Sequence, residues 1–200
     1  MTKIPISLIY LRFCLGLLII LVTTLQIANY KIVAITLLTI GLLTDIADGI
    51  IARRLAVSTQ KLRRLDSTVD QVFFASVVLA TYTQCPEFFR ENISQISVLI
   101  GIECLAYLVS YIKFKKEIAT HSIGAKIWTL LLFATLVQLL YQCQSTILFQ
   151  ICFWIGIATR LEIIAIILIL KQWTNDVPNL FYALKLRQGK EIKRNKLFNG

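Results

Sequence analysis

Six long apolar stretches run through the sequence, and they restrict the possible folds more than any other feature. They lie at about residues 5–28, 32–51, 69–85, 94–113, 124–142 and 147–170. A helix needs about 20 apolar residues to cross roughly 30 Å of hydrocarbon, and the stretches lack the alternating polar pattern of a barrel strand. We therefore expect an all-α membrane protein with a bundle of six transmembrane helices.

The composition agrees with a membrane location. Of the 200 residues, 57% are hydrophobic and 16% are charged, whereas a soluble domain is about half apolar and about a quarter charged. The first stretch follows Lys3 as a signal peptide would, but it is long and no clear small-x-small cleavage site follows, so we expect a retained helix. We expect one membrane domain at 1–172 and a basic tail at 173–200.

The distribution of charge predicts the orientation. The chain has 21 Lys and Arg residues against 11 Asp and Glu, a net charge of +10. With a cytoplasmic N-terminus, almost all cations fall on the inner side and only Lys31 and Arg90 fall outside. We expect a multi-pass protein of a bacterial inner membrane with both termini in the cytoplasm. The net charge favours contact with anionic membrane lipid, not nucleic acid, because no phosphate-reading motif or aromatic basic groove is present.

The tail has an amphipathic pattern. Pro178 can open a short helix in which Leu180, Phe181 and Leu184 share one side, with basic residues nearby. This pattern predicts a helix at the membrane interface, and a specific site for a lipid head group is the alternative.

The chemistry is concentrated between the second and third stretches, where four of the eleven acidic residues occur. Asp45 and Asp48 are three residues apart, and Asp66 and Asp70 are four apart, so each pair lies on one face of a helix. Carboxylates gathered at a membrane edge need a cation to offset their repulsion, and hard divalent ions prefer oxygen ligands. The spacing predicts a metal site, although acidic residues at helix ends can also form a simple solvated border.

The same segment resembles the signature of the CDP-alcohol phosphotransferase family. It reads D-x-x-D-G-x-x-A-R from Asp45, followed after a loop by D-x-x-x-D from Asp66. The resemblance implies a six-helix membrane enzyme with a polar active site on the cytoplasmic side. It further implies two divalent ions, Mg²⁺ or Mn²⁺, a CDP-diacylglycerol donor, a small alcohol acceptor and a homodimer.

The resemblance also implies a role for each matching residue. Asp45, Asp48 and Asp66 match metal ligands, and Asp70 matches the residue that approaches the metals and takes the proton from the acceptor alcohol. Three positions match contacts to the CDP portion of the donor: Gly49, Arg53 and Thr59. Leu62 departs from the pattern, because the family has Gly at this position, four residues before its third aspartate. The larger side chain of Leu62 predicts a narrower nucleotide pocket.

The acceptor is less well defined by the sequence. Arg12, Lys126 and Arg160, which lies beside Glu162, are candidates for a pocket that binds an acceptor phosphate. Arg12 is similar to an arginine in the first helix of family members that use glycerophosphate, which favours glycerol 3-phosphate or a similar polyol phosphate. Serine, inositol and a lipid alcohol remain alternatives. For Arg160 and Glu162 the structural alternative is an ion pair, either mutual or between helices, and for Lys126 it is an anchor at the membrane end.

Two other classes of membrane protein also use acidic residues. A membrane prenyltransferase would carry N-x-x-x-D-x-x-x-D or D-D-x-x-D motifs, which do not occur here. A small cation transporter would place carboxylates deep in several helices, whereas these cluster at one connection.

Cys85 and Cys143 fall near the predicted outer helix ends, where a disulfide is conceivable if their Cα atoms lie close enough.

Overall fold

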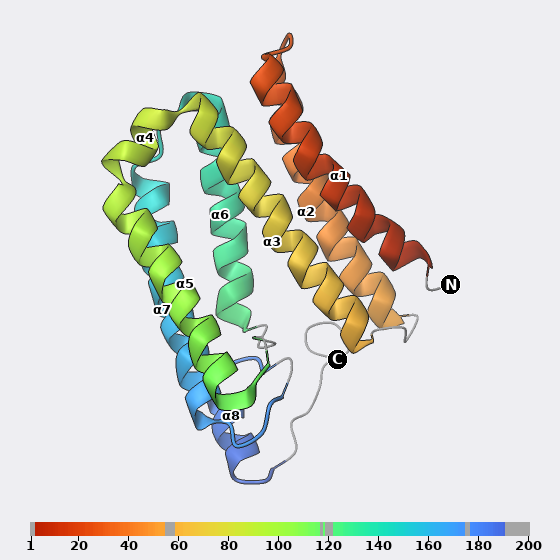
Figure 1. The fold of residues 1–200 in the computed structure, drawn as a ribbon, viewed down its shortest axis with the longest axis vertical. Helices are drawn as coiled ribbons and strands as arrows, with labels where there is room; N and C mark the ends of the chain where they lie inside the picture. Colours follow the sequence, from red (N-terminus) through yellow and green to blue (C-terminus); the bar gives the residue numbers. More distant parts are fainter. Residues whose placement is uncertain (1–2, 55–58, 117, 119–121, 175–176, 191–200) are drawn as a thin grey trace. The chain divides into compact units, whose positions relative to one another are not determined.

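The structure, a computed structural model, describes residues 3–54, 59–116, 118, 122–174 and 177–190. Within these ranges it is all-helical and contains no strand (Figure 1). The helices in chain order are α1 (Lys3–Leu25), α2 (Tyr30–Arg54), α3 (Gln60–Gln84), α4 (Pro86–Glu91), α5 (Ile93–Phe114), α6 (Ile123–Gln142), α7 (Ile147–Ile169) and α8 (Leu180–Arg187).

Five of the described helices are long and apolar enough to cross a membrane: α1, α2, α5, α6 and α7. The prediction of an all-α, multi-pass membrane protein is therefore confirmed. The predicted stretch 69–85 lies within α3, a helix of 25 residues whose first turns carry several charged side chains. These charges lower its hydropathy, so the sixth span stays a prediction.

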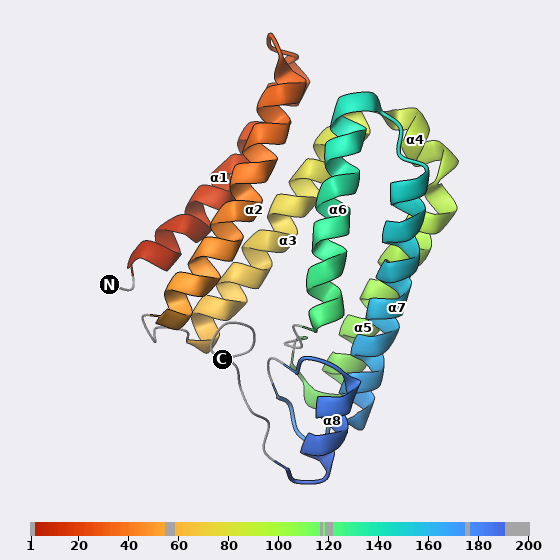
Figure 2. The same ribbon diagram turned by 180° about the vertical axis from the view of Figure 1, so that it is seen from behind.

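The chain divides into two compact units, one formed by Met1–Phe89 with Leu136–Gln144 and the other by Arg90–Thr135 with Ser145–Gly200. The boundary predicted from sequence, between 172 and 173, stays a prediction. In the first unit α1 packs extensively against both α2 and α3, whereas α2 and α3 touch each other much less (Figure 2). One such contact is made at Gly41, where a Cβ atom would collide with the ring of Phe73.

A disulfide closes one end of the first unit. Cys85, the C-cap of α3, is bonded to Cys143, and their Cα atoms lie 5.2 Å apart. At the same end the side-chain amide of Gln84 donates to the carbonyl of Thr23 at 2.9 Å. The disulfide that the sequence made conceivable is therefore present, and it fastens the residues that follow α6 to the end of α3.

In the second unit α5 packs against α7, and α8 packs against α7. Asn179 caps α8 by accepting from the backbone N–H of Tyr182 at 3.2 Å. Ala183 is buried in a cluster with Ile166 and Leu170 of the α7 region. The three apolar residues of the predicted interfacial side remain exposed: Leu180, Phe181 and Leu184. The helix predicted after Pro178 is thus present, and its free apolar side fits the interfacial location that we expect.

Candidate active site

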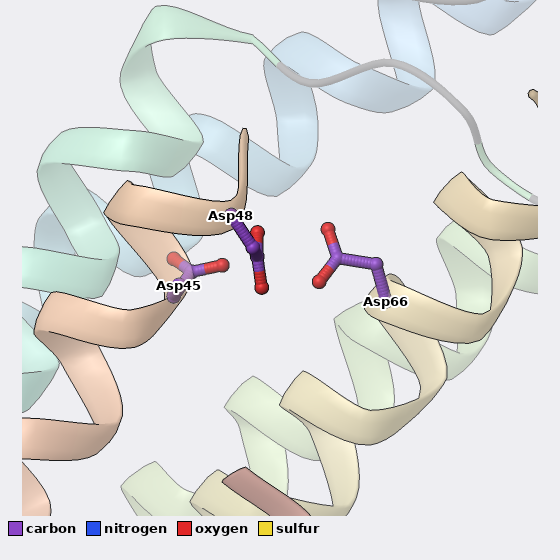
Figure 3. A group of neighbouring side chains, drawn as sticks. All are labelled: Asp45, Asp48 and Asp66. Atoms are coloured by element: carbon purple, nitrogen blue, oxygen red, sulfur yellow. The ribbon is translucent and has the colours of Figure 1, made fainter. Parts of the chain in front are cut away.

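Two helices of the first unit supply the aspartates. Asp45 and Asp48 lie in the last turns of α2, and Asp66 lies in the second turn of α3. Each of these three residues offers an oxygen, and the three oxygens lie within 4.8 Å of one another. Figure 3 shows the carboxylates of α2 facing the carboxylate of α3. The two regular spacings in the sequence therefore do bring the predicted ligands together in space.

Arg12 of α1 lies at the centre of the aspartates. Its Nη1 donates to Asp66 Oδ1 at 3.0 Å, lies 3.4 Å from Asp45 Oδ1 and forms an ion pair with Asp70. Its Nη2 forms an ion pair with Asp48. One guanidinium from α1 thus bridges all four carboxylates of α2 and α3.

Burial within this cluster is uneven. The side chains of Arg12 and Asp48 are 1% and 3% exposed, whereas those of Asp45, Asp66 and Asp70 are 33%, 30% and 28% exposed. The cluster therefore has a sealed side at the buried Arg12–Asp48 pair and an accessible side at the other three carboxylates. A ligand can reach the cluster from the accessible side.

Close packing of α1 explains how Arg12 reaches both aspartate pairs. One helical turn after Arg12, a Cβ atom at Gly16 would lie 3.3 Å from the side chain of Ser76 on α3. At this distance the side chain of Ser76 would have to shift by a few tenths of an ångström to admit a Cβ atom, so α1 and α3 approach closely here. Ile9, three residues before Arg12 on α1, is 1% exposed, so Arg12 extends from a buried apolar face of the helix.

The predicted donor contacts lie on both sides of the α2–α3 connection. Gly49 follows Asp48 directly in α2 and is half-buried; Arg53 is in the last turn of α2, and its side chain lies outside the described residues. Thr59 is the exposed N-cap of α3, where its Oγ1 accepts from the backbone N–H of Leu62 at 3.2 Å. Thr59 thus stabilises the start of α3 as its N-cap. The predicted roles of these residues in donor binding stay predictions.

The second unit contains a separate charged cluster around Arg160 of α7. Its Nε donates to Glu103 of α5 at 2.6 Å, and its guanidinium lies 3.5 Å from the ring centre of Trp128 on α6. The interhelical ion pair anticipated as the structural alternative is therefore present, and the carboxylate is that of Glu103, whereas Glu162 follows Arg160 by two residues on the same helix. Lys126 lies in the first turn of α6 and is exposed.

The sequence did not identify the acidic partners of either buried arginine. Arg12 was predicted only as a contact for an acceptor phosphate, and Glu103 was not predicted as the partner of Arg160. A usable signal existed, because an arginine inside an apolar helix requires a counter-ion and the acidic residues of such a chain are few.

The cluster of aspartates fits divalent metal ions. It consists of carboxylate oxygens, the ligands that Mg²⁺ and Mn²⁺ prefer. The same four carboxylates surround one cation of the chain, the Arg12 guanidinium. The site thus defines a membrane protein with a carboxylate cluster able to hold a metal.

Comparison with known families identifies the class of reaction. The family model described as CDP-alcohol phosphatidyltransferase matches residues 2–176. The chain therefore belongs to the CDP-alcohol phosphatidyltransferase family and is a transferase of phospholipid synthesis. Comparisons with curated proteins and with solved structures found no match.

Proposed function

We propose that the protein transfers a phosphatidyl group from CDP-diacylglycerol to an alcohol and releases CMP. In this reaction the acceptor oxygen forms a bond to the phosphorus that carries the diacylglycerol, and the bond from that phosphorus to the CMP oxygen breaks. The proton of the alcohol goes to a carboxylate. The single observation that carries the proposal is the cluster of four aspartates from α2 and α3 in a chain of this family.

Within the site we propose different roles for the four carboxylates. Asp45, Asp48, Asp66 and Asp70 would hold two divalent ions, Mg²⁺ or Mn²⁺. Bound there, the ions would supply charge neutralisation for the diphosphate and for the departing CMP. Asp70 would also accept the proton of the acceptor hydroxyl; its partly exposed side chain supports this role, because a base must be reachable from the substrate side.

The donor would be bound by residues that flank the aspartates. Gly49 has no side chain, so a nucleotide can approach the helix backbone beside Asp48. Arg53 can pair with a phosphate, and Thr59 offers a hydroxyl at the start of α3. Gly49 follows Asp48 directly in α2, and Thr59 caps the helix that carries Asp66, which supports a donor head group bound beside the carboxylates.

For the acceptor we favour glycerol 3-phosphate or a similar polyol phosphate. Arg12 brings a guanidinium to the carboxylates, and a guanidinium binds phosphate through parallel hydrogen bonds. Lys126 remains a proposed second contact. Arg160, whose guanidinium pairs with Glu103, is a further candidate. Serine, inositol or a lipid alcohol is the alternative acceptor for the same reaction.

We further propose that the aspartates face the cytoplasm. The disulfide between Cys85 and Cys143 supports this orientation, because disulfides persist in oxidising compartments and not in the cytoplasm. Cys85 follows Asp70 by 15 residues on α3, which corresponds to about 22 Å along a helix. The disulfide and the aspartates therefore lie toward opposite ends of α3. In this arrangement α3 would be the sixth membrane helix of the bundle, and the acyl chains of the donor would lie in membrane lipid.

A panel of acceptors tests the proposal. Purified protein is mixed with CDP-diacylglycerol, Mg²⁺ and one of glycerol 3-phosphate, serine, inositol, inositol phosphate or phosphatidylglycerol, and CMP is measured. We expect the largest release with a phosphorylated polyol. Release with serine or unphosphorylated inositol alone would identify the alternative acceptor class, and no release with any acceptor would contradict the proposed reaction. The molar mass of the purified protein in nanodiscs tests the proposed homodimer.

A further inference from the structure

We propose that Arg12 is the internal counter-ion of the metal-free site and competes with divalent metal ions for the aspartates. The inference rests on the proposed metal dependence and concerns how this chain controls it. Its effect would be to make metal binding weaker than the four carboxylates alone would allow, while keeping these carboxylates together when no metal is bound.

The first argument is geometric. Both terminal nitrogens of Arg12 are engaged, Nη2 with Asp48 and Nη1 with carboxylates of both helices. Three of its four partners are the residues whose oxygens lie within 4.8 Å of one another and can hold a metal: Asp45, Asp48 and Asp66. The guanidinium and a metal ion would therefore use the same small set of oxygens.

The second argument is electrostatic. A guanidinium and a divalent ion repel each other, and this repulsion is strong where water is scarce, as at the buried Arg12–Asp48 pair. A carboxylate oxygen that is bound to a metal has less electron density to offer a hydrogen-bond donor. Metal binding at the cluster must therefore weaken the bonds of Arg12 to at least some of its partners.

The third argument concerns how firmly Arg12 is held. Its Nε is buried, and among the described residues it finds no hydrogen-bond partner. A guanidinium with a structural role alone usually has its buried donors satisfied. The ion pairs with the carboxylates are thus what holds the Arg12 guanidinium in place. A metal ion that binds those carboxylates also removes the interactions that keep the guanidinium there.

Four carboxylates in a membrane protein would repel one another without a cation. Arg12 solves this problem in the absence of metal, because it comes from a third helix and reaches α2 and α3 at once. The protein can then fold with its active site already assembled. Each metal ion must then displace the Arg12 guanidinium from carboxylate oxygens. This competition raises the metal concentration needed to fill the site.

Binding of Mn²⁺ to the purified full-length protein, followed by electron paramagnetic resonance, tests the inference without any activity measurement. Arg12→Gln removes the competing charge, and Lys31→Gln is the matched control. Lys31 is a cation of the same unit that donates to the carbonyl of Tyr141 at 3.1 Å, and it precedes Asp45 by 14 residues, or about 21 Å of helix.

We expect Arg12→Gln to bind Mn²⁺ at least about tenfold more tightly than the wild type, because one hydrogen bond to a charged group already changes a binding constant by that factor. Without metal, Arg12→Gln should unfold at a lower temperature than the wild type. Added Mn²⁺ should raise the unfolding temperature of Arg12→Gln by more than it raises that of the wild type. Lys31→Gln should match the wild type in affinity for Mn²⁺.

Equal or weaker Mn²⁺ binding by folded Arg12→Gln would overturn the inference. If that variant does not fold, Arg12→Lys decides the matter, since a lysine keeps the charge but lacks the fork that bridges several carboxylates. Tighter binding by Arg12→Lys supports competition, and unchanged or weaker binding overturns it. Absence of Mn²⁺ binding by the wild type would instead contradict the proposed function, so the two failures can be told apart.

Discussion

Arg12 and Asp48 form an ion pair whose side chains are only 1% and 3% exposed. The arginine belongs to α1 and the aspartate to the last turns of α2. The pair therefore joins the aspartate cluster to α1, the helix that packs against both α2 and α3. Asp45 contacts the same guanidinium at 3.4 Å but is 33% exposed. The two aspartates of α2 thus have the same chemistry and different surroundings.

This difference predicts unequal stability costs. In the presence of a metal chelator, Asp48→Asn should lower the free energy of unfolding by about 1.5–3 kcal/mol, the range for a buried hydrogen bond to a charged group. Asp45→Asn should cost about 1 kcal/mol or less, as for exposed ion pairs. Thermal unfolding of both variants in nanodiscs measures the difference. Equal losses in the free energy of unfolding would contradict the division of the cluster into a sealed side at Asp48 and an accessible side at Asp45.

Asp70 and Asp45 should differ in catalysis. A general base contributes typically 10²–10⁴-fold, so Asp70→Asn should reduce turnover by about that range and leave donor binding measurable. Asp45→Asn should weaken metal-dependent donor binding, and a higher Mg²⁺ concentration should recover part of the loss. Donor binding and single-turnover CMP release are measured for both variants. Near-normal turnover of Asp70→Asn would show that another group takes the proton.

Leu62 should narrow the nucleotide side of the site. It lies in the first turn of α3, one turn before Asp66, and is partly buried. Leu62→Gly should strengthen donor binding or broaden donor choice, at a helix cost of roughly 1 kcal/mol. Thr68→Gly, an exposed position of the same helix, controls for that cost. If donor affinity and selectivity in Leu62→Gly equal those of the control, Leu62 does not border the nucleotide.

The disulfide and the aspartates should lie on opposite sides of the membrane. Ala28 is exposed in the turn between α1 and α2, at the end of the unit that carries Cys85, and Arg64 is exposed near the start of α3. In intact cells, a maleimide that cannot cross the membrane should label Ala28→Cys and spare Arg64→Cys until the cells are opened. The reverse pattern would place the aspartates outside.

Most of the fold was predictable because apolar length alone determines where a helix can span a membrane. The spacing of Asp45 with Asp48, and of Asp66 with Asp70, also predicted the shared faces that meet in the structure. Neither signal could identify Arg12 as their common partner, since Arg12 and Asp45 are 33 positions apart in the sequence and meet only through the tertiary packing of α1. The pairing of Arg160 with Glu103, 57 residues apart, escaped for the same reason. Local spacing shows which side chains share a helix face, but not which helix lies opposite.

Production of CMP by the purified protein in nanodiscs is the most direct test of the central claim. CDP-diacylglycerol, glycerol 3-phosphate and Mg²⁺ are supplied together and then omitted one at a time, with Asp45→Asn and Lys31→Gln assayed alongside. The account predicts CMP and a new phospholipid only when all three components are present, with greatly reduced release by Asp45→Asn and unchanged release by Lys31→Gln. Equal CMP release in the presence of a metal chelator, or release that Asp45→Asn leaves intact, would contradict a metal-dependent transferase built on these aspartates.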